Sequence, residues 1–175
     1  MNKKRILGID CSSSTVGLSV LDFDGYKESL IHAEYYKPKK EKDQNFIITL
    51  KEIREFIIEF CKKWSPIDYI AIEEFLMVFG NKYQKGSSSA QTIIKLAIVN
   101  RTVSLAVLDV LNILPIFLHS SSVRKEIKNA AEIEETPQKK DLPALLEKIL
   151  DIKFPYQYNK RGNLMEESYD IGDSV

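Results

Sequence analysis

The alternation of hydrophobic and polar residues at the start of the chain predicts three consecutive strands. Each apolar run is rich in β-branched and aromatic residues, and polar turn residues separate the runs, which is typical of paired strands. The Asp24-Gly25 pair in particular is a hairpin-turn sequence. The three predicted strands are 5–10, 15–21 and 27–36.

A change of periodicity then predicts a helix followed by a buried strand. Over residues 45–64 the apolar side chains recur every three or four positions, and Ser65-Pro66 ends the pattern. Residues 67–72 form a nearly continuous apolar run that leads into Glu73-Glu74. Such a run indicates a strand buried on both faces, and α/β sheets commonly carry their sites where such strands end.

The second half of the chain is predicted to be mainly helical. Residues 75–89 form a loop, and Ala90–Leu111 forms a long helix that is apolar on more than one side. Such a helix belongs either to the core or to a subunit interface. A fifth strand over 115–119 follows, and then a helix over 120–129 that begins in a run of serines suited to capping.

Two further helices are predicted before the chain ends. One spans 136–150, unless Pro143 kinks it or moves its start to Asp141. After a loop over 152–165 the other begins at 166 and has little length before the chain stops. We therefore expect the natural protein, or at least its family's fold, to continue beyond this point.

The composition fits one globular domain and directs attention to carboxylates. The chain has 175 residues, of which 44% are hydrophobic and 29% charged. No apolar run is long enough for a bilayer and no secretory signal is evident, so we expect a cytoplasmic protein. The abundance of Lys, Ile and Asn suggests an AT-rich genome, that of a bacterium or its phage. The two cysteines follow no metal or redox spacing, and the two histidines offer little to histidine-based chemistry. The 25 basic and 25 acidic residues cancel, which does not favour DNA binding by net charge.

Acidic residues occupy three comparable positions in this arrangement. Asp10 ends the first strand, Glu73 ends the fourth, and Asp170 with Asp173 stands at the start of the last helix. If the first and fourth strands are neighbours, the carboxylates can converge. Converging carboxylates repel unless something positive lies between them, and a hard divalent cation with oxygen ligands is the usual solution. Two such ions about 4 Å apart can activate a water and stabilise the leaving oxygen at a phosphodiester.

Each position also has a purely structural interpretation. Asp10 can be a turn former, and Glu74 rather than Glu73 can be the inward carboxylate. The Asp170 and Asp173 pair can simply be favourable charge near a helix N-terminus. The combination of all three positions in one chain is what favours a metal site.

Four segments resemble the RuvC-like Holliday junction resolvases, in order and in spacing. They are ILGIDCSSSTVGLSVLD, YIAIEEF, LPIFLHSSSVRKEI and the closing YDIGDSV. The resemblance covers nearly the whole chain and implies a ribonuclease H-like α/β fold, in which helices flank a mixed five-stranded sheet made of an antiparallel meander and two parallel strands. One departure is Cys11-Ser12-Ser13, where many relatives have a proline or glycine pair.

The resemblance also implies an activity and a set of functional residues. Asp10, Glu73, Asp170 and Asp173 would hold two Mg²⁺ ions, for which Mn²⁺ can substitute, and a homodimer formed through Ala90–Leu111 would nick a four-way DNA junction symmetrically. Forks and other branched DNA are possible further substrates. An aromatic residue of the loop would stack at the junction centre, and basic residues would contact phosphates. The candidates for these contacts are Phe75, Phe79, Lys82, Tyr83, Lys85, Arg124 and Lys140.

Two other functions remain compatible with parts of the sequence. GIDCSSSTVGLSV also suits the phosphate loop of the sugar kinase and actin superfamily of ATP-binding proteins, although the chain is short for two lobes and lacks a second glycine-rich loop. A junction-binding protein without catalysis is the other alternative. Only the acidic set argues against it.

Overall fold

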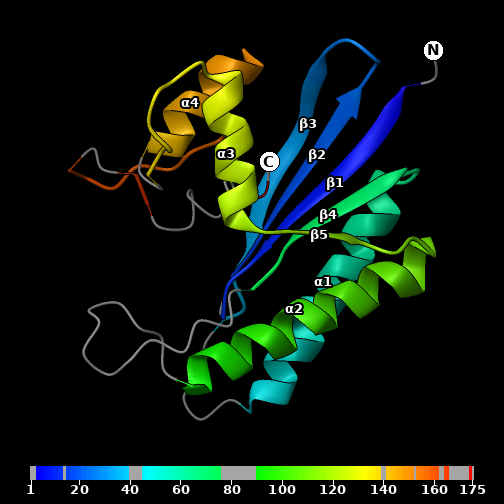
Figure 1. The fold of residues 1–175 in the computed structure, drawn as a ribbon. Helices are drawn as coiled ribbons and strands as arrows, with labels where there is room; N and C mark the ends of the chain where they lie inside the picture. The colour runs from blue at the N-terminus through cyan, green and yellow to red at the C-terminus, as the bar shows by residue number, and fades with distance from the viewer. Residues whose placement is uncertain are drawn as a thin grey trace.

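The computed structural model contains a five-stranded mixed sheet with two helices on each face (Figure 1). It describes residues 3–13, 15–39, 45–75, 90–138, 141–151, 153–161, 164–165 and 174. In these segments, no helix has the length and apolar character needed to cross a membrane.

The sheet has the predicted architecture of a meander joined to two parallel strands. β1 (Lys4–Cys11), β2 (Val16–Phe23) and β3 (Glu28–Tyr36) pair in antiparallel fashion. β4 (Tyr69–Glu73) pairs parallel to β1, and β5 (Ile116–Leu118) pairs parallel to β4, which gives the order β3-β2-β1-β4-β5. The first and fourth strands are therefore neighbours, as the convergence of their carboxylates requires.

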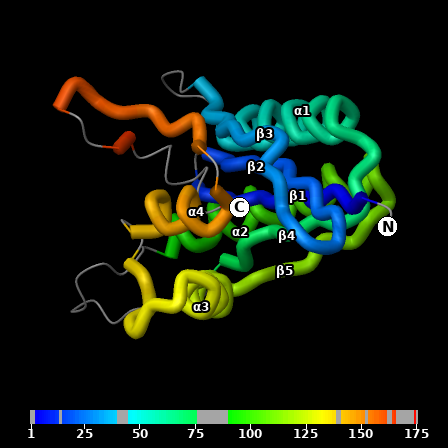
Figure 2. The backbone as a smooth tube through the Cα atoms, turned by 90° about the horizontal axis from the view of Figure 1, so that it is seen from above, coloured from blue at the N-terminus to red at the C-terminus, as the bar shows by residue number. Residues whose placement is uncertain are grey.

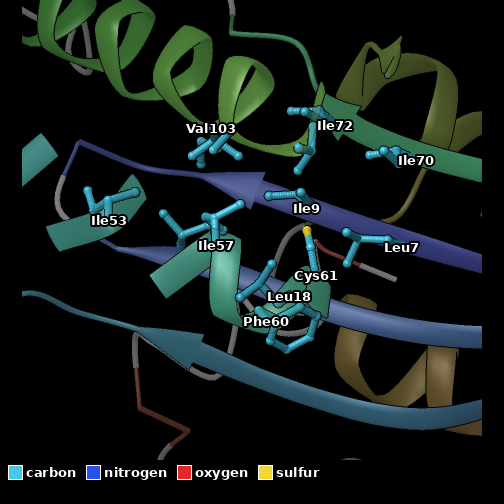
Figure 3. Close-up of a cluster of buried hydrophobic side chains, with 14 of the residues drawn as sticks. Leu7, Ile9, Leu18, Ile53, Ile57, Phe60, Cys61, Ile70, Ile72 and Val103 are labelled. Carbon is cyan, nitrogen blue, oxygen red and sulfur yellow. The ribbon is translucent and has the colours of Figure 1, made fainter. Parts of the chain in front are cut away.

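The main core lies between the sheet and the first two helices. α1 (Phe46–Trp64) begins at Asn45, whose side chain accepts a hydrogen bond from the amide of Ile47. With α2 (Ala90–Leu111) it covers one face of the sheet, as Figures 1 and 2 show. Ile9 of β1 and Ile72 of β4 belong to one apolar cluster with Val103 of α2 and Ile57 of α1 (Figure 3). Dense packing here fixes the two strand ends that carry Asp10 and Glu73.

The opposite face carries α3 (Ser120–Ala130) and α4 (Leu142–Leu150). No residue of α3 is fully buried. A smaller apolar cluster joins α4 to β3 and the segment that follows the helix; its buried members are Ala33, Leu146 and Phe154. The buried cluster on this face is much smaller than the one beneath α1 and α2.

Three sequence predictions are corrected by the structure. β4 is not buried on both faces, because Ile72 is 1% exposed but Tyr69 is 49% exposed, and α3 covers the second face only loosely. Residues 136–138 are not helical: α4 starts at Leu142, so that Pro143 falls in the first turn, where its missing N–H costs nothing. The serines that open α3 are not its cap, since His119 occupies that position and makes no side-chain capping bond.

Candidate active site

Asp10 and Glu73 stand side by side where two parallel strands end. The pairing of β1 with β4 runs to Ile9 opposite Ile72, so Asp10 and Glu73 are the next residues of the two strands. Ile9 and Ile72 belong to the core on the α1 and α2 side (Figure 3). Because side chains alternate along a strand, Asp10 and Glu73 face the other side of the sheet.

The two carboxylates make this corner of the sheet electronegative. Asp10 is 7% exposed and Glu73 is half-buried. Burial raises the pKa of the neighbouring Cys11 thiol well above its ordinary value, and the charges of Asp10 and Glu73 raise it further. A hard cation with oxygen ligands relieves the repulsion between such carboxylates, so the donor chemistry suits a divalent metal ion.

Glu74 points away from this corner. Its carboxylate accepts a hydrogen bond from Nη2 of Arg101 on α2 at 2.9 Å, and its main-chain N–H donates to the carbonyl of Leu118 at 2.8 Å. Since α2 covers the opposite face of the sheet, Glu74 and Glu73 are directed to opposite sides. This geometry favours Glu73 over Glu74 as the partner of Asp10.

Ser174, near the end of the chain, docks on the same face of the sheet as Asp10. Ser174 is 4% exposed, and its carbonyl accepts a hydrogen bond from the hydroxyl of Ser19, which is fully buried on β2. Gly8, two residues before Asp10 and opposite Ser19 in the strand register, leaves the space for this approach. A Cβ at Gly8 would overlap the Ser174 carbonyl oxygen and lie 2.7 Å from the Ser19 hydroxyl.

A cavity of about 100 Å³ lies between this face of the sheet and α3 and α4. Glu73 and Ser174 line it from the sheet side. Arg124, which is half-buried, and Ser120 line it from α3. Arg124 is thus the predicted phosphate-contact residue that the structure brings onto the same cavity as a candidate metal ligand.

Phe75 is fixed at the root of the predicted DNA-contact loop. The guanidinium of Arg101 lies 5.2 Å from the centre of the Phe75 ring and 4.4 Å from that of Phe117 on β5. Arg101 is thus attracted to the faces of both rings in addition to its ion pair with Glu74. Phe75 is therefore anchored to α2 and β5 where the chain leaves β4.

The other candidate residues lie outside the described part of the chain. These are Phe79, Lys82, Tyr83, Lys85, Lys140, Asp170 and Asp173. Among the residues that are described, no group of three or more His, Cys, Asp or Glu side chains is gathered to hold a metal ion. Asp10 and Glu73 thus form two members of the predicted set of four.

Sequence reasoning missed three residues that shape the site. Gly8 interrupts an otherwise apolar strand, and a glycine inside a strand often marks a close approach of another backbone. Asn100 is a polar residue within the apolar pattern of α2, and its Nδ2 donates to the main-chain carbonyl of Glu73 at 2.8 Å. Arg101 carries no such signal, because a charged residue on a helix is ordinarily a solvated one.

Comparison with known proteins identifies the fold class first. No family model matches the chain. Thermus thermophilus RuvC in complex with a Holliday junction substrate superposes with a TM-score of 0.67 at 16% identity, covering 97% of this chain and 87% of that one. Another Thermus thermophilus RuvC structure gives 0.63 at 16% identity, with 97% and 90% covered. The chain has the ribonuclease H-like fold of RuvC.

A curated relative extends this likeness to the sequence. The crossover junction endodeoxyribonuclease RuvC of Sulfurovum sp. (strain NBC37-1) is 32% identical over 105 residues, which are 60% of this chain and 58% of the relative. The chain thus spans less than two thirds of the length of the curated relative it matches. Its resemblance to the RuvC-like resolvases is confirmed in both sequence and fold.

Proposed function

We propose that this protein is a metal-dependent endodeoxyribonuclease that resolves four-way DNA junctions. The observation that carries the proposal is the pair formed by buried Asp10 and half-buried Glu73 at the carboxyl ends of β1 and β4, within a RuvC fold. The RuvC structure with the higher TM-score is bound to a Holliday junction, and the curated relative is a crossover junction endodeoxyribonuclease. Branched DNA is therefore the proposed substrate.

The chemistry that we assign to the carboxylates is metal binding. Mg²⁺ suits an all-oxygen site of this kind, and Mn²⁺ has similar ligand preferences. Bound divalent ions supply an activated water and stabilise the leaving oxygen of a phosphodiester. Asp10 and Glu73 would hold the cation on the sheet, while Arg124, which lines the same cavity as Glu73, is in place to contact a phosphate.

The position of Ser174 against Gly8 and Ser19 supports the assignment of Asp170 and Asp173 as the remaining ligands. Ser174 rests against Gly8, and Gly8 and Asp10 share one face of β1 because they are two residues apart. Consecutive Cα atoms are about 3.8 Å apart, so Asp173 is tethered within one residue of this seat. If residues 170–173 are helical, as the sequence predicts, the two aspartates lie three positions apart and face the same side.

A homodimer through α2 is the proposed assembly. Ile94, Ile98 and Leu105 are 58%, 40% and 59% exposed, and their spacing places them on one stripe of the helix. An exposed apolar stripe of this kind is typical of an interface. Two copies would bring two active sites to one junction, as paired nicking requires.

We expect Leu105→Glu to convert the dimer to a monomer, because a charge on the stripe would be desolvated without a partner. Sedimentation velocity measures the change. Ile47→Glu on α1, where the isoleucine is 67% exposed, is the matched control and should leave the dimer intact. A dimer that tolerates Leu105→Glu would exclude α2 as the interface.

Cleavage of defined substrates tests the activity. The protein is incubated with a labelled four-way junction, a fork and a linear duplex, each with Mg²⁺, Mn²⁺ or a chelator. We expect metal-dependent paired nicks in the junction. Asp10→Asn should bind the junction but lose more cleavage than the roughly 10- to 100-fold that follows mutation of a residue that only supports a metal ligand. Fork cutting would broaden the substrate range. Binding without cutting would favour an architectural protein, and no binding at all would make ATP binding the next test.

A further inference from the structure

Asn100 is a buried amide in a helix that otherwise packs apolar side chains against the sheet. It is fully buried, as are Val99 and Val103 beside it on α2. Its Nδ2 donates a hydrogen bond to the Glu73 carbonyl, but its Oδ1 has no hydrogen-bond partner in the part of the chain that the structure describes. An unpaired buried acceptor is costly, so core packing alone would favour an apolar residue here.

The position that Asn100 holds is the end of β4. The ladder between β1 and β4 stops at the pair Ile9 and Ile72, so Glu73 lies one residue beyond it. On the other side, Glu73 is opposite Leu118, the last residue of β5. The amide of Asn100 therefore holds the main chain of Glu73 at the position where the pairing of β4 with β1 has ended and its pairing with β5 ends.

Arg101, which follows Asn100 on α2, contacts Glu74, which follows Glu73. Arg101 binds the Glu74 carboxylate at 2.9 Å, while Asn100 binds the Glu73 carbonyl at 2.8 Å. Two consecutive contacts fix both the position of this backbone and its rotation about the strand axis. Glu74 is thereby held on the α2 side, and the Glu73 side chain stays on the opposite face, where it lines the cavity.

We infer that Asn100 is a positioning residue for the metal site, acting on the Glu73 carboxylate through the main chain. The inference rests on the proposed function, since it takes Asp10 and Glu73 as metal ligands. A neutral amide suits this role because it donates to the carbonyl without adding a charge beside the two acids. Loss of such an outer contact typically weakens metal affinity or activity by about 10- to 100-fold.

The test compares Asn100→Leu and Asn100→Ser with the wild-type protein. Leucine keeps the branched shape, serine is smaller, and neither reaches the Glu73 carbonyl as a donor. Ser104→Ala is the matched control, because it removes a hydrogen bond to the Asn100 carbonyl within α2 and leaves Glu73 untouched. Mn²⁺ and Mg²⁺ affinities are measured by calorimetry without DNA, beside metal-free thermal unfolding, junction binding in chelator, and cleavage as a function of metal concentration.

Both Asn100 variants should bind metal about 10- to 100-fold more weakly, with the midpoint of the cleavage titration raised by the same factor. Asn100→Leu should unfold close to the wild-type temperature without metal, because it also removes the unpaired Oδ1, whereas the smaller serine should unfold somewhat lower. Both variants should bind the junction in chelator as the wild type does. Wild-type metal affinity in a folded variant would overturn the inference and leave the nuclease intact. So would failure of both variants to fold, since a structural role would then suffice.

The proposed function can fail independently of this inference. If the wild type binds metal but cuts no junction, the nuclease assignment fails, and the difference in metal affinity between wild type and variants still decides the role of Asn100. If the wild type binds no metal ion, the positioning role is overturned as well.

Discussion

Replacing Gly8 by alanine is expected to lower junction cleavage by at least about 100-fold while leaving the sheet folded. The added Cβ would overlap the Ser174 carbonyl oxygen, which belongs to the backbone and cannot move aside as a flexible side chain would. Ser174 must therefore move away from Gly8. Alanine is itself accepted in a strand, so β1 and the core behind it should remain.

The expected loss follows from the proposed role of the segment that Ser174 anchors. Asp173 directly precedes Ser174 in the chain. If Asp170 and Asp173 complete the metal site, displacing Ser174 therefore draws these ligands away without altering Asp10 or Glu73. Cleavage rates at fixed Mg²⁺ and the thermal unfolding midpoint measure the two parts of the prediction. Ser19→Ala is the control and should have a smaller effect, because it removes the hydrogen bond to Ser174 but adds no atom between β1 and Ser174.

A double substitution separates this mechanism from general damage. Asp173→Asn alone should reduce cleavage strongly, but in the Gly8→Ala background it should add little, since both changes remove the same ligand and coupled effects are not additive. Full cleavage by Gly8→Ala would show that the seat of Ser174 is dispensable. Additive losses would show that Gly8 acts by another route.

The sequence predicted the sheet well because its signals were local and strong. Alternation and turn residues defined β1 to β3, and Ala90–Leu111 matches α2 in both bounds. The start of α4 was less certain because two rules conflicted there: Thr136-Pro137 looked like a helix start, but Pro143 is acceptable only in a first turn. The structure follows the second rule.

The candidate site depends more on tertiary contacts, and sequence alone predicted it only in part. The adjacency of Asp10 and Glu73 followed once β1 and β4 were taken as neighbours. The opposite directions of Glu73 and Glu74 could not be inferred, because a five-residue strand gives little alternation to read and Arg101 comes from a distant helix. The Gly8 seat likewise involves Ser174, at the other end of the chain.

The second prediction compares isosteric changes at Glu73 and Glu74. Glu73→Gln keeps the shape of the side chain but removes the charge that a divalent cation needs, so cleavage should fall at least about 100-fold. Junction binding in chelator should persist or tighten, because a negative charge facing the phosphates is lost. Nicking assays and binding titrations in the same buffer measure both effects.

Glu74→Gln should change cleavage by less than about threefold. The side chain of Arg101 is 47% exposed, and an ion pair with a partner this exposed contributes about 1 kcal/mol or less to stability. Glutamine can also still accept a hydrogen bond from the guanidinium. The two substitutions thus alter adjacent residues by the same atom exchange and differ only in the side of the sheet that each residue faces. Equal losses at both positions would contradict the assignment of Glu73 as the metal ligand, and a larger loss at Glu74 would reverse it.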